Sequence, residues 1–367
     1  MNPVPCLLLI VGAQAQPPGP APIPAPTYAP RPDLEAGRYL KALGDAEAVL
    51  KQQPENALAW AAKSQALTAL VRLPEALEAA QKALALKSGL PDGLLARALA
   101  QGGIAVQQRN LGSLRQMAYA MDDLKAAVEA DPTLVNGWMS LGLAYEQLPG
   151  ILGGSTRQAL ACAESLKKVD KVRGDVLEGT VLAMEKRWAE ALTCFNRALA
   201  AAPRDPEVIY GYLDALGSRE TRKVLGVEPQ RKIEAQEAMR LLPACGNHAR
   251  PLTTVCDALL DAGKPEDAWR IAREALPASD APSLLRLQLG KISARFGVHL
   301  EEGLKCLDQV LKEPLEGGSG GYGTAHWRRG QVLKAMGRKE EARAAAQAAL
   351  RLDPKDTKAK GLLKELQ

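Results

Sequence analysis

The sequence predicts an all-α protein, and three observations support this prediction. Apolar residues make up 47% of the 367 residues, whereas aromatic residues make up only 4%. Alanine and leucine dominate the apolar content, and they favour close-packed helices over sheets, which depend on β-branched and aromatic side chains. The third observation is a helical pattern of small and apolar residues that recurs from Asp33 onward, with Gly and Pro at matching offsets.

The first segment, residues 1–15, resembles a secretory signal peptide. A short apolar run from Val4 to Val11 precedes Ala13-Gln14-Ala15, a small-x-small cleavage pattern. The run is too short to span a bilayer, so we expect cleavage after Ala15 and a periplasmic or secreted location in a bacterial cell envelope. The alternative is an uncleaved, disordered N-terminus.

The second segment, residues 16–32, contains eight prolines in 17 positions. Proline lacks the backbone donor that helices and sheets need, so this composition predicts an extended, disordered linker with no core of its own. A proline-rich ligand for another protein is the alternative interpretation.

The clearest copy of the recurring pattern is the last, residues 325–354. Its marker residues are Gly330, Leu333, Gly337, Ala342, Ala346, Ala349 and Pro354, at spacings of 3, 4, 5, 4, 3 and 5. The first glycine allows two helices to approach closely, the second ends a helix, and the proline prevents the next helix from continuing. This pattern resembles the tetratricopeptide repeat, a 34-residue helix–turn–helix unit.

Other copies follow the same pattern with different fidelity. They cover residues 33–54, 57–88, 99–132, 135–145, 174–203, 206–242, 252–279 and 284–314. The resemblance therefore implies a right-handed α-solenoid of tandem helix–turn–helix repeats over residues 33–367. Residues 356–366 are polar enough to be a C-terminal capping helix. Insertions interrupt the period near residues 150 and 220.

The insertion near residue 150 reads LPGILGGSTRQAL, over residues 148–160, and such a glycine-rich loop could bind a phosphate. The step from Gly142 to Ala159 is 17 residues where the repeat uses 12, so five residues are inserted. No lysine follows the glycines, and Ser155 with Gln158 matches a capping box. We therefore interpret the stretch as an enlarged repeat turn, without deciding whether it binds a ligand.

The sequence contains no recognisable catalytic or metal site. Cys245, His248 and Cys256 have a partial metal-binding spacing without a fourth ligand, so we expect no metal and no cofactor. Glutamate pairs such as Glu301-Glu302 fall at expected helix starts, where the helix dipole favours them. The cysteines fall mainly at packing positions of the repeat, and Cys245 with Cys256 is the one pair considered for a disulfide. We expect no enzymatic activity.

The resemblance places a partner-binding groove along the first helix of each repeat. In the last two repeats, the groove positions of the family fall on Lys291, Arg295, Trp327, Gln331 and Lys334. These residues would form a basic strip with one exposed indole, suited to an acidic segment or a chain terminus of another protein. The net charge of +5 is confined to the C-terminal end, which argues against nucleic-acid binding by the whole chain.

Three functions remain open on this evidence. The first is an exported scaffold that binds segments of partner proteins in the groove of the solenoid. The second is a periplasmic small-ligand binding component of solute transport, with the insertions near residues 150 and 220 as pocket walls. An enzyme with an unrecognised site would be a third.

Overall fold

The computed structural model describes residues 28–35, 37–108, 111–217, 223, 226–313, 315 and 321–366. Within these residues the regular elements are helices, and no strand occurs. The predicted signal peptide, most of the proline-rich segment and most of the insertion near residue 220 lie outside the described residues. The all-α prediction is confirmed for the part of the chain that the structure describes.

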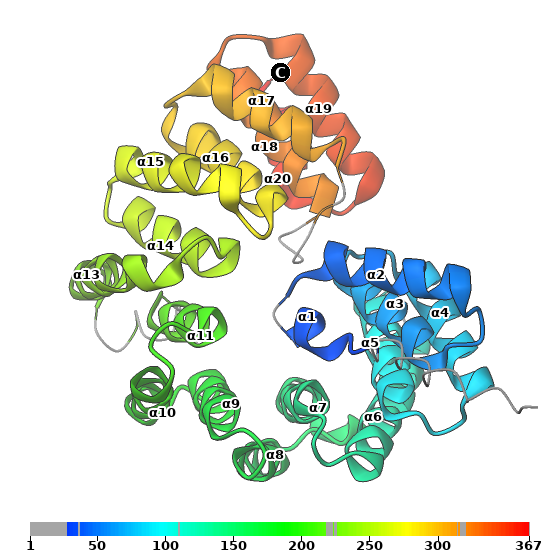
Figure 1. Ribbon diagram of the computed structural model, residues 1–367. Helices are drawn as coiled ribbons and strands as arrows, with labels where there is room; N and C mark the ends of the chain where they lie inside the picture. Colours follow the sequence, from blue (N-terminus) through cyan, green and yellow to red (C-terminus); the bar gives the residue numbers. More distant parts are fainter. Residues whose placement is uncertain are drawn as a thin grey trace, which may run out of the picture.

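The helices alternate between an inner and an outer row of the solenoid (Figure 1). The inner row consists of α3 (Ala57–Ala69), α5 (Pro91–Gln108), α7 (Val135–Gln147), α9 (Lys171–Met184), α11 (Pro206–Gly217), α14 (Ala249–Asp261), α16 (Pro282–Phe296) and α18 (Gly321–Ala335). The outer row consists of α2 (Tyr39–Gln52), α4 (Leu73–Leu86), α6 (Leu111–Ala130), α8 (Thr156–Lys167), α10 (Trp188–Ala201), α13 (Val227–Cys245), α15 (Pro265–Ala275), α17 (Leu300–Val310) and α19 (Lys339–Leu352). A short α1 (Arg31–Glu35) precedes them, and α20 (Thr357–Glu365) follows.

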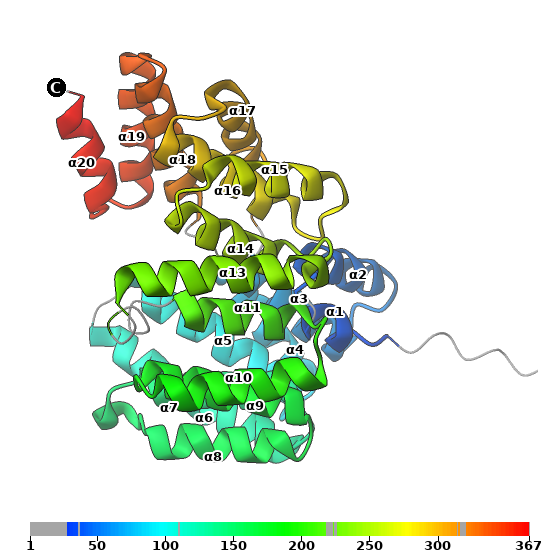
Figure 2. The ribbon, with the colours of Figure 1, turned by 90° about the vertical axis from the view of Figure 1, so that its left-hand side faces the viewer.

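The inner helices form the concave face because successive inner helices touch one another. Contacts run from α7 to α9, α9 to α11, α11 to α14, α14 to α16 and α16 to α18, besides those within each hairpin. The stack curves far enough that the N-terminal end of α2 approaches the starts of α11, α14 and α16, whereas α20 lies apart from α1 and α2 (Figures 1 and 2). Gly37 and Tyr39 line a small cavity together with Arg250 and Leu284, so the N-terminal hairpin reaches the repeats of the C-terminal half.

Glycines end several inner helices, as the sequence pattern predicted for Gly337. Gly263, Gly297 and Gly337 follow inner helices with φ of 73°, 73° and 78°, a conformation that side chains with a Cβ disfavour. At helix starts, Asn56 and Asp170 accept hydrogen bonds from backbone N–H groups of the first turn. The repeat period therefore fixes where each helix begins and ends.

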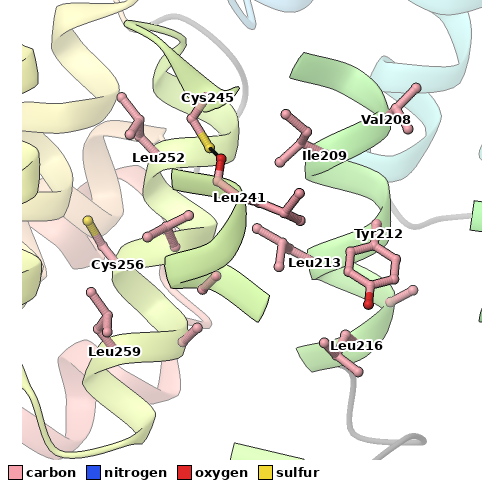
Figure 3. Close-up of a cluster of buried hydrophobic side chains, with 14 of the residues drawn as sticks. Val208, Ile209, Tyr212, Leu213, Leu216, Leu241, Cys245, Leu252, Cys256 and Leu259 are labelled. Atoms are coloured by element: carbon pink, nitrogen blue, oxygen red, sulfur yellow. Dashed lines mark hydrogen bonds between the residues drawn. The ribbon is translucent and has the colours of Figure 1, made fainter. Parts of the chain in front are cut away.

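The core consists of small and branched side chains between the helix rows. Figure 3 shows Ile209 and Leu213 of α11 facing Leu241 of α13, and Leu252 of α14 belongs to the same buried cluster. Cys245 and Cys256 belong to this buried cluster, and their thiols bond the backbone carbonyls of Leu241 and Ala268. The five described cysteines, Cys162, Cys194, Cys245, Cys256 and Cys306, are free thiols. The packing role predicted for them is therefore confirmed, and the pair considered for a disulfide is not bonded.

The N-terminal boundary differs from the predicted one. The predicted linker extends to Pro32, but α1 begins at Arg31, and Tyr28 packs against the first core cluster. Proline is compatible with the first turn of a helix, because its N–H would have no partner there. Arg31 donates two hydrogen bonds to Asp92 and one to Asp131, with distances of 2.7 to 3.0 Å. These long-range ion pairs attach the end of the proline-rich segment to the repeats.

Candidate functional site

The three cations of the expected basic strip each bind a carboxylate of a neighbouring helix. Lys291 Nζ lies 2.6 Å from both carboxylate oxygens of Asp257. Arg295 bonds Asp261 at 2.9 Å, and Lys334 bonds Glu365 at 2.6 Å. Because each positive charge is matched, the strip is less basic than the sequence of the inner helices suggests.

The indole of Trp327 is not the exposed anchor that the sequence suggested. The side chain is half-buried and packs against the C-terminal core cluster. The Arg328 guanidinium lies 4.0 Å from its ring centroid, and Lys358 Nζ of α20 lies 5.0 Å from it. The capping helix therefore shields this tryptophan, because α20 packs across α18 as well as α19.

Arg328 is a groove cation that the repeat pattern did not identify. It lines a cavity of about 230 Å³ together with Lys291 and Thr324, and its guanidinium donates to Gln331 at 3.0 Å. Among the described residues it forms no ion pair with a carboxylate. Burial lowers its pKa, with Asp257 opposing this effect and Arg295 adding to it. It was missed because the family pattern assigns position 5, Trp327, to the groove and not position 6.

A larger cavity lies at the centre of the concave face. It has a volume of about 560 Å³, within the range of ligand sites, and it is lined by inner helices α7, α9, α11 and α14 together with Trp188 and Phe195 of the outer helix α10. The lining residues are Val135, Asn136, Met139, Leu143, Gln147, Arg173, Val176, Thr180, Ala183, Met184, Trp188, Phe195, Glu207, Tyr210, Gly211, Asp214, Ala215 and Arg250. We call this cavity the central pocket.

Helix periodicity brings the lining residues of each helix to one face. On α11, Glu207, Tyr210 and Asp214 stand at i, i+3 and i+7, so they share the concave side while Ile209 and Leu213 enter the core. Residue 211 is glycine, and a Cβ there would lie 3.2 Å from the Phe195 ring. The glycine therefore lets the Phe195 ring lie against α11 at the base of the pocket.

The two arginines of the central pocket are already paired. Arg173 bonds both carboxylate oxygens of Asp205 at 3.0 Å. Arg250 bonds Glu207 at 2.8 Å, and its guanidinium lies 4.3 Å from the centroid of the Tyr210 ring. Such pairs hold both guanidinium groups in fixed positions, which leaves little of their positive charge for a ligand.

Two polar groups of the central pocket lack a partner among the described residues. The Asp214 side chain is exposed and makes no hydrogen bond or ion pair with them. Desolvation by the surrounding protein nonetheless raises the pKa of its carboxyl, with Arg250 opposing this effect. The indole N–H of Trp188 is buried and has no acceptor among the described residues. By comparison, the indole N–H groups of Trp60 and Trp138 donate to the backbone carbonyls of Pro54 and Pro132.

The glycine-rich stretch forms a capped turn away from these cavities. Gly150–Leu152 is a 3₁₀ turn, and Ser155 caps α8 by accepting from the Gln158 N–H at 3.4 Å, which is one half of the predicted capping box. The other half does not form, because the Ser155 N–H donates to the Tyr145 carbonyl at 2.7 Å. A Cβ on Gly154 would collide with the Leu148 carbonyl oxygen. None of residues 149–155 lines the central pocket, so the expected pocket wall near residue 150 is not formed there.

His248 and His299 have structural partners, and the Glu301-Glu302 pair lies at a helix start. His248 Nδ1 lies 2.8 Å from Asp280, and His299 stacks on Trp269 with ring centroids 4.5 Å apart. Glu301 and Glu302 fall in the first turn of α17, where the dipole prediction placed them. Within the described residues, no group of three potential metal ligands occurs, and no helix is long and apolar enough to cross a membrane.

Known proteins resemble the chain mainly through its repeats. Residues 33–91 and 323–356 match models of the tetratricopeptide repeat. Among solved structures, the tetratricopeptide protein TTC0263 of Thermus thermophilus has 24% identity and a TM-score of 0.42, covering 51% of this chain and 99% of its own. PilF of Pseudomonas aeruginosa has 17% identity and a TM-score of 0.42, with coverage of 63% and 97%. A tetratricopeptide repeat protein of Parabacteroides merdae has 15% identity and a TM-score of 0.35, with coverage of 92% and 95%. No curated protein matches the chain.

The two repeat matches lie near opposite ends of a continuous stack of helical hairpins. The chain therefore carries tetratricopeptide repeats near both ends of an all-α solenoid. Proteins of this class are generally non-catalytic scaffolds for protein–protein interaction, because stacked repeats create an extended concave surface.

Proposed function

We propose that the protein binds a segment of a partner protein along its concave face, with the central pocket as the main contact. One observation carries this proposal: four consecutive inner helices and α10 line a mostly apolar, open cavity that, among the described residues, retains an unpaired carboxylate and an unsatisfied indole N–H. A surface that served only to join the repeats would match such groups internally. The proposed role is an interaction scaffold without catalytic activity.

Site-specific crosslinking tests this role. The photoreactive residue p-benzoylphenylalanine would replace Leu143, which lines the pocket, or Ala161, which is exposed on the outer helix α8. On exposure of living cells to light, we expect a discrete crosslinked product from position 143 and none from position 161. Products of equal yield from both positions, or from neither, would contradict binding in the groove.

The C-terminal cavity supports an acidic contact with the same partner. Lys291, Arg295 and Lys334 are neutralised by carboxylates, so we assign the contact to Arg328, the cation there that forms no ion pair within the described residues. Arg328→Gln is expected to weaken capture of the crosslinked partner by about tenfold, as loss of a partly desolvated charge contact would. Lys334→Gln is the control, and equal effects of both variants would refute the assignment.

Export to the bacterial cell envelope is also part of the proposal. It rests on the apolar run and the Ala13-Gln14-Ala15 pattern of the sequence. N-terminal sequencing of protein isolated from envelope extracts should begin at Gln16. Envelope protein that still begins at Met1 would exclude cleavage at this position.

Small-ligand binding is the second candidate, and the volume of the central pocket favours it. A cavity of about 560 Å³ could enclose a solute such as an amino acid or a sugar. A screen of such solutes by thermal denaturation distinguishes the two functions. A solute that raises the melting temperature in a saturable way, combined with no crosslinked protein from position 143, would replace the scaffold proposal.

A further inference from the structure

The central pocket contains one charged side chain that the described repeats leave unmatched. Arg173, Glu207, Asp214 and Arg250 are the charged residues in its lining. Arg173 is held by Asp205, and Arg250 is held by Glu207. Only the carboxylate of Asp214 makes no ion pair or hydrogen bond within the described residues. The charge that the pocket presents to a ligand is therefore negative.

The walls around this carboxylate are apolar and accessible. Met139 and Leu143 of α7 and Val176 of α9 line the pocket, and Met184 at the end of α9 is 41% exposed. Unbranched methionines adapt to ligands of different shape. Lysine and arginine side chains have the matching form, because each has an apolar stem that ends in a cationic head.

Trp188 supplies a second, independent sign of a missing ligand. Its side chain is only 6% exposed, lines the pocket, and has an indole N–H without an acceptor within the described residues. A buried donor without a partner costs about 1–3 kcal/mol. The nitrogen is buried in the absence of a ligand, so a backbone carbonyl of a bound polypeptide would satisfy it once the indole turns toward the pocket. A protonated amine or polyamine carries only donors and could not do so.

We propose that the central pocket binds a lysine or arginine side chain of a partner polypeptide, with the Asp214 carboxylate as its ion-pair acceptor. This inference rests on the proposed scaffold function and specifies the partner chemistry at one position. It also differs from the sequence expectation of an acidic partner alone. A partner segment would carry a basic residue at the central pocket and an acidic group near Arg328.

Selection of displayed peptides tests the inference even though the partner is unidentified. A random 12-residue peptide library would be selected on the full chain, on Asp214→Asn and on Asp214→Lys. The parent protein should enrich lysine or arginine at one position of the aligned peptides. Asp214→Asn should lose that preference, and Asp214→Lys should favour Asp or Glu there. A merely structural role of Asp214 would not reverse the selected charge.

Affinity measurements make the comparison quantitative. Fluorescence anisotropy of one selected peptide should show about tenfold weaker binding to Asp214→Asn, and binding to the parent should weaken as salt rises. Asp122→Asn is the matched control, because Asp122 lies on the outer helix α6 with 74% of its side chain exposed. Circular dichroism melting of each variant verifies that it is folded. Equal affinities for the two Asn variants, or no enrichment of basic residues, would overturn the inference.

Two further outcomes separate this inference from the proposed function. Crosslinking from position 143 together with selected peptides that lack a basic preference would retain the scaffold role and reject the Asp214 contact. Spermidine and free arginine amide would be tested as competitors of the selected peptide. If either compound displaces the peptide and raises the melting temperature as much as the peptide does, the ligand is a small cation and the inference is overturned. Both compounds provide the cation without a polypeptide backbone.

Discussion

Phe195 provides the sharpest test of how the repeats hold the central pocket together. Its ring is 1% exposed and lies between α9 and α11, where Gly179 and Gly211 leave space for it. Truncation of such a ring to a methyl group loses the buried apolar area and leaves a cavity, which costs about 3–5 kcal/mol. We expect Phe195→Ala to destabilise the central repeats by this amount.

Gly179 makes the prediction specific to the contact. A Cβ on Gly179 would lie 3.0 Å from two atoms of the Phe195 ring, tighter than ordinary packing. In the absence of the ring, Gly179→Ala should stabilise α9 by about 1 kcal/mol, because alanine is the better helix former. With Phe195 present, the clash should cancel that gain, so the two substitutions should show a coupling of about 1 kcal/mol or more.

Urea denaturation monitored by circular dichroism measures these differences, and hydrogen exchange locates them. Repeat stacks need not unfold in a single step, so protection of amides in α9, α10 and α11 should fall before that of α18 and α19. Leu352→Ala is the control, because Leu352 is 58% exposed and should change stability by less than about 0.5 kcal/mol. A Phe195→Ala effect below about 1 kcal/mol, or strict additivity with Gly179→Ala, would refute the packing argument.

Three further predictions follow from other parts of the chain. Burial raises the pKa of all five described cysteine thiols. Alkylation with N-ethylmaleimide at pH 8, followed by mass spectrometry, should therefore be much slower in native than in unfolded protein. Rapid labelling of the native protein would contradict the burial of these thiols. Gly154→Ala should lower the free energy of unfolding by about 1–3 kcal/mol and increase proteolysis of the turn. Gly150→Ala should be nearly neutral, because a Cβ at residue 150 meets no atom within 4 Å. Similar effects of the two substitutions would be inconsistent with the turn geometry. Burial alone would raise the pKa of Asp131, but hydrogen bonds from Thr133 and Arg31 outweigh burial and lower the pKa. The ionised Asp131 therefore stabilises the folded state above its unfolded pKa, near 4, and this stabilisation is lost as the pH falls below that value. Arg31→Ala should reduce this acid-induced loss of stability in urea titrations at pH 3 to 6, and an unchanged pH profile would show that the Arg31 contact contributes nothing.

The candidate site was predictable only in part. Of the predicted groove residues, Lys291 lines the C-terminal cavity, whereas Arg295, Trp327, Gln331 and Lys334 do not line it. Helix periodicity states which side chains share a face. It does not state which charges meet across helices, so the neutralisation of Lys291 by Asp257 and the shielding of Trp327 by α20 could not be read from it.

The sequence by itself determined the helices, their turns and their order, because small residues, helix-ending glycines and prolines act through local backbone geometry. It also determined that Ser155 closes the glycine-rich turn, since a capping box is a contact between residues three positions apart. Only the tertiary structure decided which groove charges remain unmatched. Asp214 and Arg328 differ from their paired neighbours through contacts between helices distant in sequence, and those contacts exist only once the solenoid curves.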